Sequence, residues 1–344
     1  MKPRIKWIDS VRGWAIILVV LGHVFTRTGT LQVEKFLQIE IYSFHMPLFF
    51  YISGYVFKVR DEKLLDSTVR KIHNLLIPML IFYIIYGFFF VIKILVGKST
   101  FIFTPELFIN TLMMTSQSFF SAYWFLPVLF CTQMLFEFLN RMMNNKSMLI
   151  IKKLNIVIII SLFLVSRLLY SQGIILPMGF REAMGALPFF VLGFYAKNVK
   201  SIKKITDYLT DLVVGKKTSY FVAKIIFIIF VFLCIAKLQY RLCNMYNSDI
   251  GSIAFYFLFG IIGILLSVSF GKVFGNGVFE ILGKNSLWIF GFHYIALDIY
   301  SDVVNRITIN NILCKLGMDI VGVILIVVFS LVLNYGMIWL KNFK

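Results

Sequence analysis

The sequence predicts an all-α fold, a polytopic transmembrane helix bundle of about ten spans. Of the 344 residues, 60% are hydrophobic and only 15% are charged. The mean hydropathy of +0.87 is too high for a soluble domain. Apolar stretches of about 20 residues, the length that crosses a bilayer core, follow one another almost end to end. We therefore expect residues 1–344 to form a single membrane-embedded domain, with no appended soluble domain.

Hydropathy places the spans in order along the chain, each a mainly apolar run between polar segments. The sixth span is short and contains Pro188, so we expect it to be tilted, kinked or partly buried in the bundle. The predicted spans are residues 10–28, 41–58, 75–96, 119–140, 150–170, 182–196, 219–237, 252–270, 286–304 and 319–341.

The basic residues predict the orientation. With a cytoplasmic N-terminus, most of the 34 Lys and Arg residues fall in cytoplasmic segments, as the positive-inside rule requires, and both termini are then cytoplasmic. The net charge of +18 is explained by this orientation. We expect no nucleic-acid partner, because such proteins carry their charge on a water-facing domain. Asp9 and Arg12 border the first apolar run and no cleavage site follows it, so we expect no cleaved signal peptide.

Several enzyme classes lack their expected motifs. No Walker loop, G-x-S-x-G elbow, H-E-x-x-H helix or dinucleotide fingerprint is present, which argues against ATPase, hydrolase, zinc-protease and dehydrogenase chemistry. The four cysteines form no C-x-x-C pair, so neither a zinc site nor a redox motif is predicted. We expect no metal and no tightly bound cofactor.

The first span carries the clearest candidate site. Arg12 and His23 are eleven residues apart, which on a helix puts them within about 20° of one face and about 16 Å apart. Arg12, at the cytoplasmic end of the span, can hold an anionic ligand, and a neutral His23 imidazole deeper in the membrane can take a proton from a hydroxyl. This combination suits a reaction with a CoA thioester. Asp9 is spaced to pair with Arg12. Alternatively, Arg12 is a membrane-surface anchor and His23 a packing residue.

Other polar residues in or beside spans are candidates because such groups are costly in a membrane. His45 lies at a depth similar to that of His23, so these two can share a cavity, while His293 lies nearer mid-membrane. A structural role is the alternative for His45 and for His293. A basic group before the third span can clamp donor phosphates or anchor the membrane surface: Arg70, Lys71 and His73. On the outer side, charges and an aromatic face can orient an acceptor sugar, although aromatics there also form membrane belts: Arg181, Glu182 and Trp124.

Two short runs, WIDSVRG at 7–13 and LGH at 21–23, resemble the opening of the acyltransferase-3 family of integral membrane proteins, with its Arg-x10-His spacing. Four further matches follow in order: MPLFFYISGY at 46–55, YWFLPV at 123–128, LPFFVLG at 187–193 and GKNSLW at 283–288. The resemblance implies a ten-helix protein of the bacterial cytoplasmic (inner) membrane, which moves acyl groups from cytoplasmic acyl-CoA to hydroxyls of cell-surface glycans. Within the family, the chain resembles fucose O-acetyltransferase-like and enterobacterial-common-antigen-like members, which lack an appended soluble domain.

By motif position, Arg12 and His23 inherit the essential roles of the family. Its membrane-embedded Ser-Gly-Phe/Tyr element corresponds to Ser53, Gly54 and Tyr55. One departure is that some members carry Arg-x-x-Arg before the third helix, whereas here the second arginine is replaced by His73.

We hypothesise that His23 acts as general base on a sugar hydroxyl, which attacks the thioester of acetyl-CoA as co-substrate, while Arg12 holds the CoA phosphates. A transient acyl-histidine is an alternative route. Rival readings are a transporter or flippase for lipid-linked sugars, and an enzyme that moves succinyl or a longer acyl chain. The expected partners are an acyl-CoA donor, a cell-surface glycan or lipid-linked saccharide, and membrane lipids.

Overall fold

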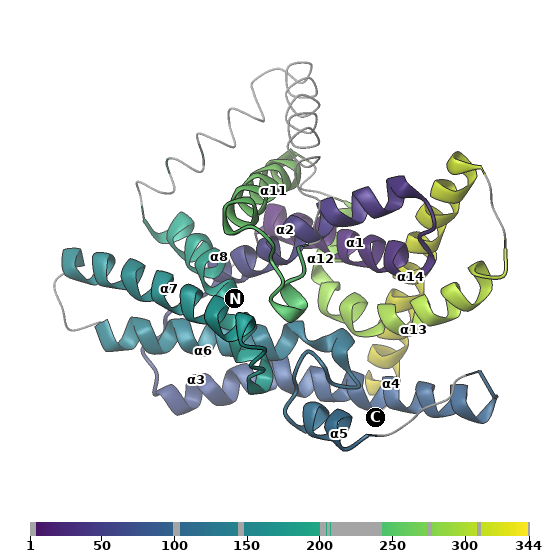
Figure 1. The fold of residues 1–344 in the computed structure, drawn as a ribbon, viewed down its shortest axis with the longest axis horizontal. Helices are drawn as coiled ribbons and strands as arrows, with labels where there is room; N and C mark the ends of the chain where they lie inside the picture. Colours follow the sequence, from purple (N-terminus) through teal and green to yellow (C-terminus); the bar gives the residue numbers. More distant parts are fainter. Residues whose placement is uncertain are drawn as a thin grey trace, which may run out of the picture. The chain divides into compact units, whose positions relative to one another are not determined.

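The computed structural model describes residues 5–98, 104–143, 148–199, 204, 207, 243–273, 277–307 and 311–342. These residues form helices and connecting turns without a β-strand (Figure 1). The chain divides into two compact units. The first comprises Met1–Ile52, Tyr195–Cys243 and Ile250–Lys344, and the second comprises Ser53–Phe194 and Asn244–Asp249.

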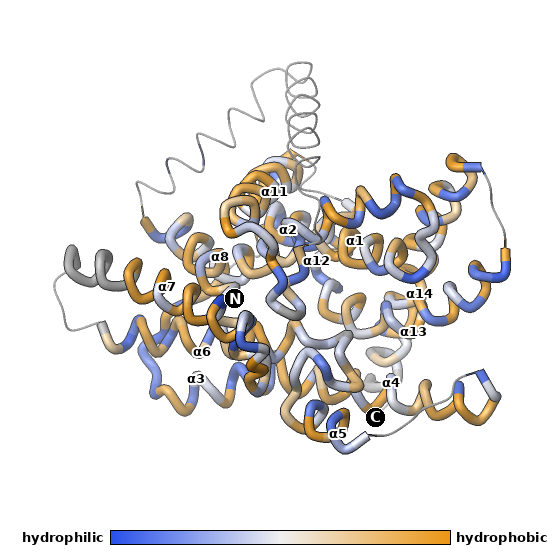
Figure 2. The backbone as a smooth tube through the Cα atoms, in the orientation of Figure 1, coloured by the Kyte–Doolittle hydropathy of each residue, from blue (hydrophilic) through white to orange (hydrophobic). Residues whose placement is uncertain are grey.

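Of the described helices, five are long and apolar enough to cross a membrane: Lys6–Thr28, Leu64–Leu95, Ile253–Val273, Ser286–Val304 and Ile312–Met337. They correspond to the first, third, eighth, ninth and tenth predicted spans. Helices also occupy the second, fourth, fifth and sixth, and the seventh, at 219–237, lies outside the described residues. Figure 2 shows hydrophobic residues along α11 (Ile253–Val273) and along the coloured part of α7 (Met148–Ser171). The chain is therefore a membrane protein built of helices.

In the first unit, α1 (Lys6–Thr28) packs against α11, α12 (Val278–Lys284), α13 (Ser286–Val304) and α14 (Ile312–Asn342), and also against α2 (Gln32–Val56). The sequence produces this packing because apolar side chains recur on α1 every three or four residues, which is one helical face. That face lies in a core with α13 and α14, and its residues are Ile16, Val19, Val20 and Val24. The helix α2 follows α1 after a short turn.

In the second unit, α3 (Leu64–Lys71), a π-helical turn (Ile72–Leu76) and α4 (Ile77–Leu95) form one continuous helix. The π turn lies just before Pro78, which has no N–H to donate to the carbonyl one turn earlier, and the Ile77 N–H bonds to Ile72 O instead. The helix therefore begins at Leu64, about three turns before the start of the predicted third span at residue 75.

The rest of the second unit is α5 (Pro105–Leu112), a 3-10 turn (Ser121–Tyr123), α6 (Phe125–Met143), α7, a second 3-10 turn (Pro177–Gly179), α8 (Phe180–Asn198) and a third 3-10 turn (Met245–Asn247). The predicted fourth span begins six residues too early, since 119–124 form turns and the helix starts at Phe125. The helix α8 continues through Pro188, and its first turns are largely buried.

Candidate active site

Two glycines allow α1 to lie directly against α12. A Cβ added at Gly283 would lie 1.6 Å from Asp9 O, and one added at Gly13 would lie 2.0 Å from Phe279 O. Since any larger residue would force the two backbones apart, glycine is needed at both positions. This contact supports the first turns of α1, which carry Asp9 and Arg12.

Asp9 orients the guanidinium of Arg12. Arg12 Nη1 lies 3.4 Å from Asp9 Oδ1, and the Asp9 side chain is 3% exposed while that of Arg12 is 27% exposed. A buried carboxylate thus supports a cation that solvent or a ligand can reach. Such a group can bind a phosphate or another anion.

His23, near the other end of α1, is the centre of a cluster of five aromatic rings. The His23 ring centroid lies 5.3 Å from that of His293 and 5.0 Å from that of Tyr294, both on α13. Tyr42 of α2 lies 6.3 Å from His23 and 5.0 Å from His45. The structure therefore adds His293 to the two histidines that the sequence placed at a similar depth. His45 and His293 are buried and His23 is partly exposed.

Two tyrosines of this cluster were missed in the sequence. Tyr42 Oη lies 3.4 Å and Tyr294 Oη 3.5 Å from His23 Nδ1. The Arg27 guanidinium lies over the Tyr294 ring, 5.9 Å from its centroid, and pairs with Asp298 at 3.3 Å. Neither tyrosine belongs to a motif, and nothing in the pattern separates them from the other tyrosines among the chain's 16.

The two buried histidines are held by backbone carbonyls. His45 Nδ1 lies 2.7 Å from Ile41 O, and His293 Nδ1 lies 2.7 Å from Phe290 O. The buried His293 Nε2 has no hydrogen-bond partner among the residues that the structure describes. A buried acceptor without a partner is costly, so this atom is suited to a donor supplied by a ligand.

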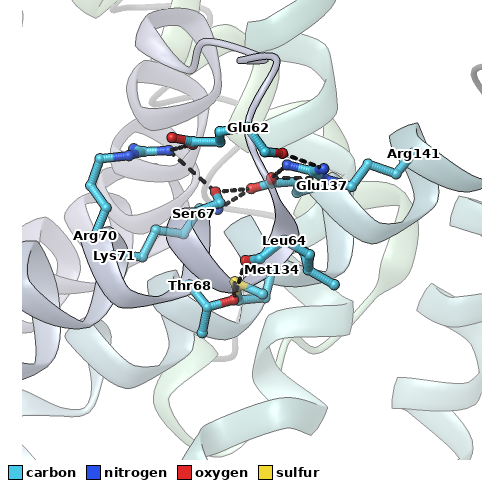
Figure 3. Close-up of polar contacts among 9 residues, drawn as sticks. All are labelled: Glu62, Leu64, Ser67, Thr68, Arg70, Lys71, Met134, Glu137 and Arg141. Carbon is cyan, nitrogen blue, oxygen red and sulfur yellow. Dashed lines mark hydrogen bonds and ion pairs between the residues drawn. The ribbon is translucent and has the colours of Figure 1, made fainter.

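The basic group before the third predicted span belongs to the second unit, where Arg70 and Lys71 are engaged in a polar network (Figure 3). Arg70 pairs with Glu62, and the Arg70 guanidinium lowers the pKa of the Glu62 carboxyl below its usual value of 4.5. Lys71 is buried and pairs with Glu137 of α6. His73 is exposed.

The residues predicted to meet an acceptor also lie in the second unit and are partly paired. Arg181 Nη2 lies 2.6 Å from Glu182 Oε1, and both side chains are buried. Trp124 makes an edge contact with Tyr246, with centroids 5.9 Å apart.

The Ser53-Gly54-Tyr55 element has a clear packing role. A Cβ at Gly54 would lie 1.8 Å from Phe190 O of α8, so glycine allows this end of α2 to contact the α8 backbone. Ser53 and Tyr55 flank that contact and are partly exposed.

Comparison with known proteins gives consistent results. A family model described as an acyltransferase domain matches residues 5–339. Nodulation protein NolL of Mesorhizobium japonicum is 29% identical over 139 residues, which are 38% of this chain and 35% of that protein. Nodulation protein NolL of Sinorhizobium fredii is 41% identical over 81 residues, which are 21% of each protein. The chain thus spans about a third or less of these curated relatives. No solved structure matches the chain.

Proposed function

Because the chain belongs to the acyltransferase-3 family, we propose that it transfers an acetyl group from acetyl-CoA to a hydroxyl of a cell-surface glycan or of its lipid-linked precursor. The observation that carries this proposal is the cluster around His23, which combines a partly exposed imidazole with two buried ones. The family match over residues 5–339 supports a single catalytic domain.

In the proposed reaction, His23 takes the proton of the acceptor hydroxyl as the hydroxyl oxygen attacks the thioester carbonyl carbon. The carbon–sulfur bond then breaks, the acetyl group stays on the glycan oxygen, and the CoA sulfur leaves with the proton that the imidazolium returns. Arg12, held by Asp9 at 3.4 Å, binds the phosphates of CoA. Arg70 and His73 supply further donor contacts in this proposal, while Lys71 supports them through its pair with Glu137.

The proposed acceptor site uses the remaining residues of the cluster. His45 and His293 offer ring nitrogens to sugar hydroxyls. Within the second unit, taken by itself, we propose that Ser53, Tyr55 and Trp124 contact a sugar and that the Arg181–Glu182 pair positions these side chains.

The proposed location is the bacterial cytoplasmic membrane, with both termini in the cytoplasm. The distribution of Lys and Arg supports this orientation. It places Arg12 at the cytoplasmic end of α1, on the side where acetyl-CoA is available.

The first experiment is mass spectrometry of surface glycans from cells that carry wild-type protein, His23→Ala protein, or none. We expect a mass increment of one acetyl group only with the wild type, while His23→Ala protein still accumulates in the membrane. Tyr335→Phe, which changes an exposed side chain of α14, is the control and should match the wild type. An increment of succinyl size would correct the acyl group, and identical glycans in every strain would overturn the function in favour of a transporter.

A second experiment tests the donor site. Arg12→Ala should weaken the binding of CoA to purified protein by about tenfold or more, because a charge-assisted contact is lost. Arg306→Ala removes an exposed arginine outside the site and is the control. Equal CoA affinity in the two variants would show that Arg12 does not hold the phosphates.

A further inference from the structure

Thr26 begins a chain of hydrogen bonds that reaches His23. Thr26 Oγ1 lies 2.8 Å from Gly22 O, one turn earlier on α1. A carbonyl oxygen can only accept, so the threonine hydroxyl must donate its one proton there. Gln38 Nε2 of α2 donates to the same Oγ1 at 2.7 Å. Toward any further partner, Thr26 Oγ1 is therefore an acceptor.

Tyr42 continues the chain. Its hydroxyl lies 3.2 Å from Thr26 Oγ1 and 3.4 Å from His23 Nδ1. Because Thr26 has no proton left, the Tyr42 hydroxyl donates to it. The Tyr42 oxygen can then only accept from His23, so a hydrogen bond between the two requires a proton on His23 Nδ1.

We propose that this chain of Gly22 O, Thr26, Tyr42 and His23, the tautomer relay, fixes the His23 proton on Nδ1 and leaves Nε2 as the atom that takes the acceptor's proton. Tyr42 is thus a positioning residue for the base, and this role rests on the proposed function. The distance of 3.4 Å is long for a hydrogen bond, as is common for catalytic groups without bound substrate. The ring nitrogen that bonds a partner determines which nitrogen is free to react.

The two neighbouring histidines have the same arrangement. Nδ1 of His45 and Nδ1 of His293 each lie 2.7 Å from a carbonyl oxygen, so both must carry a proton there. All three imidazoles of the cluster then offer Nε2 as an acceptor, and His293 Nε2 is buried without a partner among the described residues. A cluster of nitrogen acceptors is complementary to a molecule rich in hydroxyl donors, such as a sugar.

Tyr294 is the competitor of this relay. Its hydroxyl lies 3.5 Å from His23 Nδ1. If Tyr294 donated its proton to His23 Nδ1, the imidazole proton would be on Nε2. The lone pair of His23 would then be on Nδ1, facing the tyrosines, and Nε2 could not accept the proton of the acceptor hydroxyl. The two arrangements are mutually exclusive, so a measurement of the His23 tautomer decides between them.

The packing of the relay offers matched variants. Tyr42→Phe keeps the ring and removes the hydroxyl. Thr26→Val keeps the shape and removes the acceptor, which frees the Tyr42 proton to donate to His23 Nδ1 and should move the His23 proton to Nε2. Thr26→Ser keeps the hydroxyl and should behave like the wild type. Tyr335→Phe, outside the cluster, is the control for loss of a phenol.

The experiment records the ¹⁵N spectrum of ring-labelled histidines in the full-length protein, since protonated and bare ring nitrogens have well-separated resonances. The signals of His23 are those lost in His23→Gln protein. We expect Nδ1–H in the wild type and in Thr26→Ser, mostly Nε2–H in Thr26→Val, and a mixture in Tyr42→Phe. For acetyl transfer we expect kcat to fall about tenfold in Tyr42→Phe and more in Thr26→Val, with unchanged KM for acetyl-CoA.

Two outcomes would overturn the relay. One is Nε2–H at His23 in the wild type, which would assign the contact to Tyr294. The other is a Tyr42→Phe protein that matches Tyr335→Phe in both tautomer and kcat. The ¹⁵N spectrum is recorded without substrate, so it tests the tautomer relay independently of activity. Absence of acetyl transfer by the wild type would refute the proposed function and would leave the test of the tautomer relay unaffected.

Discussion

The buried pair of Lys71 and Glu137 is expected to respond unequally to loss of its two members. The two side chains are only 3% and 5% exposed. Glu137 has other partners, because Ser67 Oγ donates to its Oε2 at 2.7 Å and Arg141 Nη2 lies 2.5 Å from its Oε1. Lys71 has the Ser67 hydroxyl at 2.7 Å and the face of the Phe57 ring, 5.6 Å from its centroid. Figure 3 shows the polar part of this arrangement.

The magnitudes follow from what each substitution leaves behind. Glu137→Leu leaves the Lys71 ammonium buried without a carboxylate, which typically costs about 3–5 kcal/mol. Lys71→Met leaves the Glu137 carboxylate compensated by Arg141, so the loss should be about 1–2 kcal/mol. The stability loss of the double variant should be smaller than the sum of the two single losses by about 1–3 kcal/mol, because neither Lys71 nor Glu137 then leaves a buried charge without its partner.

The assay is unfolding of the purified protein in mixed micelles of increasing denaturing detergent, with retention of CoA binding as a second readout. Lys35→Met, at an exposed lysine of α2, is the control. The reasoning would be refuted by equal losses for the two single variants, or by a greater loss for Lys71→Met. A Lys71→Met protein of wild-type stability that no longer binds CoA would instead make Lys71 a direct donor contact, as the sequence alone suggests.

Two further perturbations test the second unit. Gly54→Ala should destabilise the protein by about 2 kcal/mol or more, because the added Cβ would lie 1.8 Å from Phe190 O. The control is Gly336→Ala, where a Cβ meets nothing within 4 Å, and this variant should be neutral or slightly stabilised. Equal Tm values for the Gly54→Ala and Gly336→Ala proteins would contradict the close contact at Gly54. Arg70 lowers the pKa of Glu62, so this pair stabilises the fold above the unfolded pKa of about 4.5 and loses its effect as pH falls through the lower folded value. The Tm of Glu62→Gln should therefore be below that of wild type at pH 7 and approach it in acid, and a gap independent of pH would refute the role of the ion pair.

The sequence predicted the helices well wherever an apolar run is bounded by polar residues. The start of the Leu64–Leu95 helix was missed because its first two turns are amphipathic and carry Asp66, Arg70 and Lys71, which hydropathy assigns to a loop. The buried Lys71 is tolerated in the helix because α6 supplies Glu137. A partner on another helix is not visible in a local window of sequence.

The same limit applies to the candidate site, and it explains why the histidines were found and the tyrosines were not. A histidine in a span is conspicuous, because few ionisable groups are placed there without a function. A tyrosine is common in such segments, and only its lateral neighbour gives it a role: Tyr42 matters because Gly22 leaves room for its ring against α1, where an added Cβ would lie 2.9 Å from Tyr42 Cε2. That glycine directly precedes His23, so the Gly-His step of the motif places the imidazole and also leaves room for the Tyr42 phenol beside it. The motif can be recognised within one segment of the sequence, whereas the phenol comes from a second helix and leaves no mark in that motif.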